Sequence, residues 1–414
     1  MNILIRPSVL KGVISAPASK SYTHRALILS ALATGNSVIS RFLQSEDTVA
    51  TLSALKKLGI KVEIKNSRVH VKGSGGHIRL PANQLQIDLN NSGTSLRLLM
   101  GLCCLTDGRT VLTGSRKLLK RPVDELVGSL QKLGITVTVR SKKNEFPGVE
   151  VYGGKLTGGE IIIDCARSSQ FLSALLLIAP FAQKDLIIRP LNLSSAPYAD
   201  ITLDLMKKFG AEISGNINAL RVDSRKKYHS LNYTVEGDYS SAAYFFAANA
   251  IGGSEIKINN LNPRSRQGDK IFLRVLNQMK NGNKLRGIEI DMNKYPDLVP
   301  VLAVTAAFAG GKTLIKNISH LRSKESDRIQ ATASQLVKMG IDVKQKDSSL
   351  LIFGGRPKGA EIETFDDHRL AMSFAVAALN ARGVTVIKNA QTVNKSYPDF
   401  WRDLKKTGAD YEVI

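Results

Sequence analysis

The sequence is poor in the features that mark membrane, secreted and metal-binding proteins. Its 414 residues include only three cysteines, Cys103, Cys104 and Cys165, an odd number without the spacing of metal ligands. Its most extended apolar stretch, residues 171–182, is too short to cross a bilayer and contains Pro180. The N-terminus does not begin with the basic and then apolar residues that direct secretion. These absences predict a cytoplasmic protein with buried, reduced thiols and no metal.

Acidic and aromatic residues are also scarce. There are 35 Asp and Glu residues against 58 Lys and Arg residues, which gives a formal net charge of +23. Such a surplus favours anionic partners, whether nucleic acid, an acidic membrane surface or small phosphorylated molecules, although a generally basic surface would give the same charge. Aromatic residues make up only 6% and are not interleaved with the basic residues, which argues against binding of single-stranded nucleic acid. A nucleic-acid-binding protein stays the alternative from a different functional class.

Six segments share one pattern, in which an aspartate opens an amphipathic stretch that closes on a lysine-rich turn, usually with glycine. They cover residues 47–59, 124–134, 200–210, 269–280, 327–340 and 399–408. The pattern predicts six helices, each with an aspartate as its N-terminal cap, lysines near the negative pole of the helix dipole and a glycine in the left-handed turn that follows. The fourth segment lacks the glycine.

A second predicted helix precedes each of these, and it begins with polar residues before it turns apolar on all sides. The starts are SKSYTHRALIL, NNSGTSLRLLM, ARSSQFLSALLL, GDYSSAAYFFAA, YPDLVPVLAV and DDHRLAMSFAV. A helix of this kind should be buried, while its N-terminal N–H groups and partial positive charge form an anion site. The period of about 70 residues, with β-rich runs between the helices, indicates a βαβ-containing unit repeated six times in two domains of three.

Basic side chains gather at these helix starts. They are Lys20, Arg25, Arg97, Arg121, Lys324, Arg328, Arg369 and Lys395. The arginine fork binds carboxylate and phosphate, and its recurrence at equivalent repeat positions favours binding over a solvated helix end. Asp297 and Glu325 lie amid these cations and are candidates either for acid–base catalysis or for structural ion pairs. His368 is a candidate for proton transfer or phosphate binding, or a satisfied polar side chain.

Ten motifs run in the order in which a known family carries them, from residue 16 to residue 401. They are PASKSYTHRALIL, NNSGTSLRLL, LLKRPVDEL, SSQFLSALLL, APYADITLDLM, VEGDYSSAAYF, DMNKYPDLVP, LRSKESDRI, DDHRLAM and NKSYPDFW. The sequence resembles the enolpyruvyl transferase family, on the branch whose acceptor is 3-phosphoshikimate. The resemblance implies an α/β (α+β) fold, a two-domain inside-out α/β barrel of six βαβαββ repeats, three per domain. The upper domain would comprise residues 1–16 and 237–414, the lower domain residues 17–236, and the active site would lie in the interdomain cleft.

The resemblance also implies an activity. The enolpyruvyl group of phosphoenolpyruvate would pass to the 5-hydroxyl of 3-phosphoshikimate by addition and elimination, in chorismate and aromatic amino acid biosynthesis. The partners would be these two small molecules, with no cofactor, metal, nucleic acid or membrane, and the protein would be a monomer. The enolpyruvyl transferase that acts on UDP-N-acetylglucosamine is the nearest enzyme alternative, but SSQF, KESDR and DDHR favour the shikimate branch.

The same resemblance assigns residues to each substrate. The contacts to 3-phosphoshikimate would come from Lys20, Ser21, Arg25, Ser168, Ser169, Gln170, Ser195, Tyr198, Asp297, His320 and Lys324. The contacts to phosphoenolpyruvate would come from Lys20, Gly93, Thr94, Arg121, Gln170, Arg328, Arg369 and Lys395. Asp297 would take the proton of the acceptor hydroxyl, and Glu325 would protonate the methylene carbon, with Lys20 as a competing candidate.

Three positions can be compared with the residues that relatives carry there. His320 stands where many relatives have asparagine, and Leu98 stands where many have proline. Gly93 keeps the small residue that lets glyphosate fit in the sensitive class.

Overall fold

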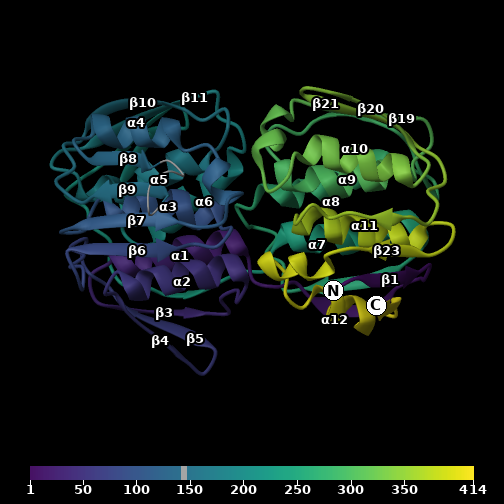
Figure 1. Cartoon of the computed structure of the whole chain (residues 1–414), viewed down its shortest axis with the longest axis horizontal. Helices are drawn as coiled ribbons and strands as arrows, with labels where there is room; N and C mark the ends of the chain where they lie inside the picture. The colour runs from purple at the N-terminus through teal and green to yellow at the C-terminus, as the bar shows by residue number, and fades with distance from the viewer. Residues whose placement is uncertain (141–146) are drawn as a thin grey trace. The chain divides into compact units, whose positions relative to one another are not determined.

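The computed structural model describes residues 1–140 and 147–414. The chain divides into two compact units. The continuous unit is Ala18–Glu236, and the terminal unit combines Met1–Pro17 with Gly237–Ile414. Each unit has its own buried apolar core, and in each the strands run along the outside of a group of helices (Figure 1). The expected mixed α/β architecture is confirmed.

Three four-stranded sheets of the continuous unit have the same strand arrangement. Their orders are β14-β3-β5-β4, β6-β7-β9-β8 and β10-β11-β13-β12. The strands are β3 (Asn36–Ser40), β4 (Lys61–Lys65), β5 (Arg68–Lys72), β6 (Gln84–Asp88), β7 (Arg109–Thr113), β8 (Thr136–Arg140), β9 (Gly148–Tyr152), β10 (Gly159–Asp164), β11 (Leu186–Leu191), β12 (Ile213–Asn216), β13 (Ala219–Val222) and β14 (Asn232–Thr234). The first two strands of each sheet are parallel and the others antiparallel. A parallel pair needs a crossover, which a helix supplies between β6 and β7 and again between β10 and β11.

The terminal unit repeats this arrangement in two of its sheets, β18-β19-β21-β20 and β22-β23-β1-β24, and adds the pairs β15-β2 and β16-β17. Its strands are β1 (Ile3–Arg6), β2 (Lys11–Ser15), β15 (Glu255–Asn259), β16 (Lys280–Asn281), β17 (Lys284–Leu285), β18 (Glu289–Asp291), β19 (Lys312–Lys316), β20 (Asp342–Lys346), β21 (Ser349–Phe353), β22 (Glu361–Ile362), β23 (Thr385–Ile387) and β24 (Asp410–Val413). Ile3 lies opposite both Ile387 and Val413, so the two ends of the chain meet in one sheet (Figure 1).

The six apolar helices are buried, as their all-round hydrophobicity predicts. They are α1 (Lys20–Leu32), α3 (Gly93–Cys103), α5 (Gln170–Ile178), α7 (Tyr239–Gly252), α9 (Val299–Ala307) and α11 (His368–Asn380). Leu27, Leu98 and Phe374 have no exposed surface. Burial of each such side chain contributes roughly 1.5–3 kcal/mol. The three cysteines are free thiols and are buried, also as expected.

The six amphipathic segments form helices as well. They are α2 (Glu46–Lys57), α4 (Asp124–Lys132), α6 (Pro197–Lys208), α8 (Phe272–Met279), α10 (Arg328–Lys338) and α12 (Phe400–Lys406). The glycines after five of them adopt positive φ, as predicted, at Gly59, Gly134, Gly210, Gly340 and Gly408. Short 3₁₀ helices connect other elements: η1 (Leu118–Lys120), η2 (Ala179–Phe181), η3 (Gly268–Ile271), η4 (Pro296–Leu298), η5 (Ser319–Ser323) and η6 (Ala390–Lys395).

The prediction that an aspartate caps each amphipathic helix is wrong for most of the six. Asp327 does cap α10, where its side chain accepts hydrogen bonds from the N–H groups of Ile329 and Gln330. Helix α2 instead begins at Glu46 behind a capping box of Ser45, and α6 begins at Pro197, whose ring needs no N–H acceptor. Asp47 and Asp200 therefore lie inside the first turns of their helices, where their side chains have other uses.

None of the helices formed by residues 1–140 and 147–414 combines the length and apolar character that crossing a bilayer requires.

Candidate functional site

In the continuous unit, the first turns of α1, α2 and α3 are joined through side chains. Lys20 is the first residue of α1, and its Nζ lies 3.0 Å from Oδ2 of Asp47 in α2. The backbone oxygen of Asp47 accepts a hydrogen bond of 3.1 Å from Oγ of Ser95 in α3. The side chains of Lys20 and Asp47 are 14% and 5% exposed. The ammonium of Lys20 is thus held in a fixed place beside three helix starts.

The starts of α3 and α5 are linked by the amide of Gln170. Its Nε2 donates to Oγ1 of Thr94 at 3.0 Å, and its Oε1 accepts from Nη1 of Arg97 at 2.9 Å. Arg97 is buried and also donates to the backbone oxygen of Pro122 through Nε and Nη2. This network fixes the orientation of the Gln170 amide and holds the loop before α4 against α3.

The same loop brings Arg121 to the N-terminus of α3, where Gly93 is the first helical residue. A Cβ atom at Gly93 would lie 2.1 Å from Nη1 and 2.5 Å from Cζ of Arg121. Only a glycine therefore lets the guanidinium lie directly against the helix start. A guanidinium beside free backbone N–H groups is a favourable place for an anion.

Arg25 is 1% exposed and binds three helices together. Its Nε donates to Oγ1 of Thr202 in α6 at 2.6 Å, and its Nη2 donates to Oγ of Ser173 in α5 at 3.1 Å. Further bonds go to the backbone oxygens of Ser21 and Tyr198. Burial lowers the pKa of Arg25 to about 10, so the side chain stays charged at neutral pH. Most of its donors serve the structure of the site.

Hydroxyl groups surround the starts of α5 and α6. Ser168 accepts a hydrogen bond of 3.2 Å from the N–H of Gln170, and Ser169 is the N-cap residue of α5. Ser195 has a φ of 54° and lies just before α6. Its buried Oγ has no hydrogen-bond partner among the residues that the structure describes. An unsatisfied buried hydroxyl costs about 1–3 kcal/mol, which a ligand at this position would offset.

In the terminal unit, Arg328 is surrounded by three carboxylates. Its Nη1 donates to Oδ1 of Asp297, its Nη2 to Oε2 of Glu325 and its Nε to Oδ2 of Asp367, each at 2.8 Å. The Arg328 side chain is 1% exposed. Burial alone would lower the pKa of Arg328, but the three carboxylates outweigh it and raise that pKa. Arg328 therefore fixes η4, the loop before α10 and the start of α11 against one another.

Two further predicted residues join this cluster. Nη2 of Arg369 donates to Oδ2 of Asp297 at 2.8 Å, and its Nη1 donates to the hydroxyl of Tyr244 at 3.4 Å. Nζ of Lys395 lies 3.5 Å from Oε1 of Glu325. Each of the two candidate acid–base carboxylates thus contacts Arg328 and one other cation. Asp297 and Glu325 are thus both members of ion pairs, and their role in acid–base catalysis stays a prediction.

His320, in η5, is buried at 5% exposure, and neither ring nitrogen has a hydrogen-bond partner within the described part of the chain. Burial, followed by the charge of Lys324, lowers the pKa of His320 to about 3. The ring is therefore neutral at physiological pH and offers one donor and one acceptor. His368 is buried beside Asp367, with its Nδ1 3.8 Å from Oδ1 of that residue.

Three carboxylates of these clusters were not singled out from the sequence as site residues. Asp367 holds Arg328 and caps α11, and Asp47 holds Lys20. Asp269 is buried, accepts a hydrogen bond from Ser240 Oγ, and has its pKa raised to about 7 by burial and then by Asp297. Asp47 and Asp269 head two of the repeated segments, and DDHR contains Asp367. The repeated segments and the DDHR motif thus contain these aspartates. The sequence pattern does not distinguish an aspartate that caps a helix from one that belongs to a site.

The chain was compared with known proteins. The family described as EPSP synthase (3-phosphoshikimate 1-carboxyvinyltransferase) matches residues 5–404. The 3-phosphoshikimate 1-carboxyvinyltransferase of Methanococcus vannielii is 38% identical, and the alignment covers 100% of both chains. That of Methanosarcina mazei is 40% identical, over 100% of this chain and 99% of the relative. The solved EPSP synthase of Acinetobacter baumannii superposes with a TM-score of 0.82 at 29% identity, over 100% of both chains. These matches include the residues described above in the continuous unit and those around Arg328 in the terminal unit. The chain belongs to the EPSP synthase family.

Proposed function

We propose that this protein transfers the enolpyruvyl (1-carboxyvinyl) group of phosphoenolpyruvate to the 5-hydroxyl of 3-phosphoshikimate, with release of phosphate, in the shikimate pathway. The observation that carries this proposal is the full-length match to relatives with that name at 38% and 40% identity. These relatives do not favour transfer to UDP-N-acetylglucosamine or a nucleic-acid-binding role.

The two clusters supply what two polyanionic substrates require. Lys20, Arg121 and the starts of α3 and α5 would bind the phosphate and carboxylate of the donor from one unit, and Arg328, Arg369 and Lys395 from the other. Charge-assisted hydrogen bonds contribute about 1.5–3 kcal/mol each, so several of them offset the repulsion between the substrates. The acceptor would take Ser21, Ser168, Ser169, Ser195 and Tyr198 from the continuous unit and His320 and Lys324 from the terminal unit.

In the addition step, the acceptor oxygen forms a bond to the central enol carbon, and the methylene carbon gains a proton. We assign removal of the acceptor hydroxyl proton to Asp297 and protonation of the methylene carbon to Glu325, with Lys20 as the competing donor. The resulting tetrahedral ketal phosphate then loses a methyl proton and phosphate, which restores the double bond. The ion pairs of Asp297 with Arg328 and Arg369 hold its carboxylate in one orientation, as a general base requires.

The finer architecture is part of the same proposal. Six βαβαββ repeats, three in each domain, would form an inside-out α/β barrel. The shared strand order of the four-stranded sheets supports this reading. The domains would be residues 1–16 with 237–414 and residues 17–236. The protein would work as a cytoplasmic monomer, with no cofactor, metal or nucleic acid.

The activity is tested by measuring phosphate release from phosphoenolpyruvate with the full chain. We expect release only when 3-phosphoshikimate is present, because its hydroxyl is the nucleophile of the addition step. UDP-N-acetylglucosamine serves as the parallel acceptor and should give no release above background. A folded protein that releases phosphate with the sugar nucleotide, or with neither acceptor, would overturn the proposal.

Replacement of Gly93 by alanine should weaken the donor site selectively. The new Cβ would overlap the guanidinium of Arg121 but no backbone atom, so the protein should fold while Arg121 is displaced. We expect the KM for phosphoenolpyruvate to rise about tenfold or more, which corresponds to the loss of one charge-assisted hydrogen bond. The matched control is Gly128→Ala in α4, where a Cβ meets no atom within 4 Å. Unchanged donor KM in Gly93→Ala would remove Arg121 from the donor site.

A further inference from the structure

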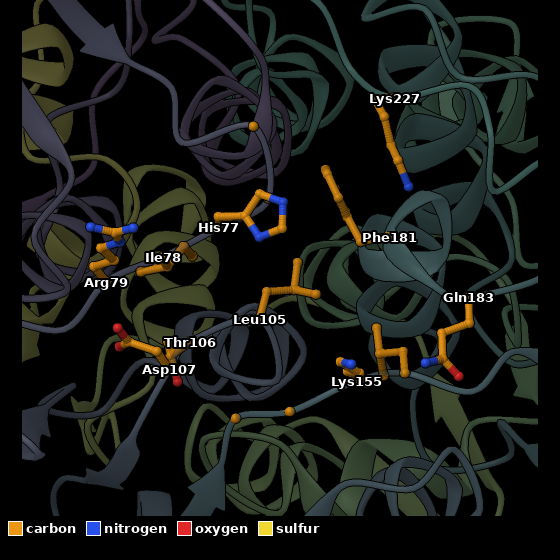
Figure 2. A pocket seen from close by; sticks show the side chains of 15 residues that line it. His77, Ile78, Arg79, Leu105, Thr106, Asp107, Lys155, Phe181, Gln183 and Lys227 are labelled. Atoms are coloured by element: carbon orange, nitrogen blue, oxygen red, sulfur yellow. The ribbon is translucent and has the colours of Figure 1, made fainter.

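A cavity lies in the continuous unit, away from the candidate site. It has a volume of about 570 Å³, which is within the range of small-molecule sites. Its lining includes the loops that follow α3 and α5, with Leu105 just beyond α3 and Phe181 in η2 (Figure 2). The loops that follow β5, β9 and β13 complete it and contribute Arg79, Lys155 and Lys227. Helix α3 starts at Gly93 and has 11 residues, so the loop after it lies about 16 Å along the helix from the start that adjoins Arg121. The cavity is thus at the opposite ends of the helices whose starts form the candidate site.

The walls of this cavity combine an apolar surface with cations. Phe181 and Leu105 face the space, and the ammonium of Lys227 lies 5.2 Å from the centre of the Phe181 ring (Figure 2). Arg79 and Lys155 line it as well, against one carboxylate, that of Asp107. None of the three cations forms an ion pair with another of the residues 1–140 and 147–414. The cavity therefore has a surplus of positive charge beside an aromatic wall.

Lys227 is the most informative of these cations. It is half-buried, and burial lowers its pKa. Its Nζ donates to the backbone oxygen of Pro180, which leaves two of its three N–H donors for other acceptors. An anion in the cavity would restore the charge balance that the protein itself does not provide.

The helix ends at this site do not oppose an anion. Carboxyl ends of helices carry partial negative charge when their carbonyl groups are unsatisfied. Just beyond α3, the N–H of Gly154 bonds to the oxygen of Cys104, and the N–H of Ile78 bonds to the oxygen of Leu105. Beyond α5, Lys227 donates to the oxygen of Pro180. These carbonyl groups are therefore already hydrogen-bonded.

The shape of the aromatic wall depends on a glycine. Gly76 has a φ of 84°, and a Cβ atom at this position would lie 2.1 Å from two atoms of the Phe181 ring. Gly76 thus lets the ring lie directly against the backbone. An apolar group in the cavity would pack against this ring and Leu105.

We propose that this cavity binds a small organic anion with a flat apolar ring, that is, an aromatic or cyclic carboxylate. The ring would pack against Phe181 and Leu105, and the carboxylate would pair with Lys227. The site is separate from the proposed catalytic cluster.

The test uses 2-naphthoate as the probe and 2-naphthamide as its uncharged equivalent, titrated calorimetrically into the full chain. We expect 2-naphthoate to bind at least about tenfold more tightly than the amide, since one charge-assisted hydrogen bond has that effect. Lys227→Gln should weaken 2-naphthoate by about tenfold. The control is Lys184→Gln, an exposed neighbour outside the cavity lining, which should leave the affinity within about twofold.

Arg121→Gln separates this site from the proposed catalytic one. If 2-naphthoate binds in the cavity, Arg121→Gln leaves its affinity unchanged, whatever that variant does to enolpyruvyl transfer. Loss of binding in Arg121→Gln with no effect of Lys227→Gln would place the probe at the helix starts and overturn the proposal. Equal binding of acid and amide, or no binding of the acid, would also overturn it.

Discussion

Asp297→Asn should lower kcat by a factor of about 10²–10⁴, the range that removal of a general base produces. The amide keeps the shape of the side chain but is not a base, so the acceptor hydroxyl keeps its proton. The substitution also removes a negative charge from between Arg328 and Arg369, which now lie 2.8 Å from its two oxygens. Binding of phosphoenolpyruvate should therefore be preserved or strengthened, which distinguishes loss of a base from collapse of the donor site.

The measurement is a steady-state assay together with direct titration of each substrate. Asp342→Asn is the matched control, because Asp342 is an exposed carboxylate of the same unit, on β20. That variant should retain full activity. If Asp297→Asn keeps a normal kcat, the proton of the acceptor goes elsewhere, and Glu325 becomes the first residue to test.

Arg328→Gln should lower the free energy of unfolding of the terminal unit by about 3–5 kcal/mol. The cause is that three carboxylates, Asp297, Glu325 and Asp367, lose the buried cation that they share. Breaking a buried ion pair on one side leaves uncompensated charge, which costs far more than loss of an exposed pair. The donor KM should rise in the same variant, because Arg328 is one of the proposed phosphoenolpyruvate ligands.

The chain contains a suitable probe for this measurement. Trp401 is its only tryptophan, and it is buried in the terminal unit with its Nε1 bonded to the backbone oxygen of Ala390 at 2.9 Å. Its fluorescence during denaturant unfolding therefore reports on the unit that contains Arg328. Arg322→Gln is the control, since Arg322 is one-third exposed and pairs with Asp327 at 2.7 Å. That variant should lose no more than about 1 kcal/mol. A loss of the same size in both variants would show that removal of the buried cation shared by the three carboxylates is not the cause.

The helices and most strands followed from local pattern. The apolar helices bury every face, so their composition alone predicted burial. In β4 and β5, apolar and polar residues alternate on both sides of the turn that joins these paired strands. Local pattern failed at helix caps. Ser45 and Asp47 are both good caps, and Ser45 caps α2 in a capping box with Thr48. Asp47 instead pairs with Lys20, which lies in another helix. Local pattern did not reveal that contact between elements.

For the candidate site, too, the sequence predicted some features and missed others. Motifs identified Lys20, Asp297, Glu325, Arg328 and Arg369, because short polar helix starts keep their residue types together in the sequence. They did not reveal what each residue contacts. Arg25 matched a ligand position, yet it donates to Thr202, 177 residues away in α6, and to Ser173 in α5. Asp367 escaped notice because its partner Arg328 comes from another repeat.

The sequence by itself determined that buried helices with polar, cationic starts recur along the chain, since helix periodicity and capping are properties of neighbouring residues. The tertiary structure alone decided which carboxylates surround Arg328, that Gly93 must be small because Arg121 lies against it, and that cations gather around a cavity at the other ends of the helices. These are contacts between residues distant in sequence, and the packing of whole elements sets them. No short segment encodes such a contact.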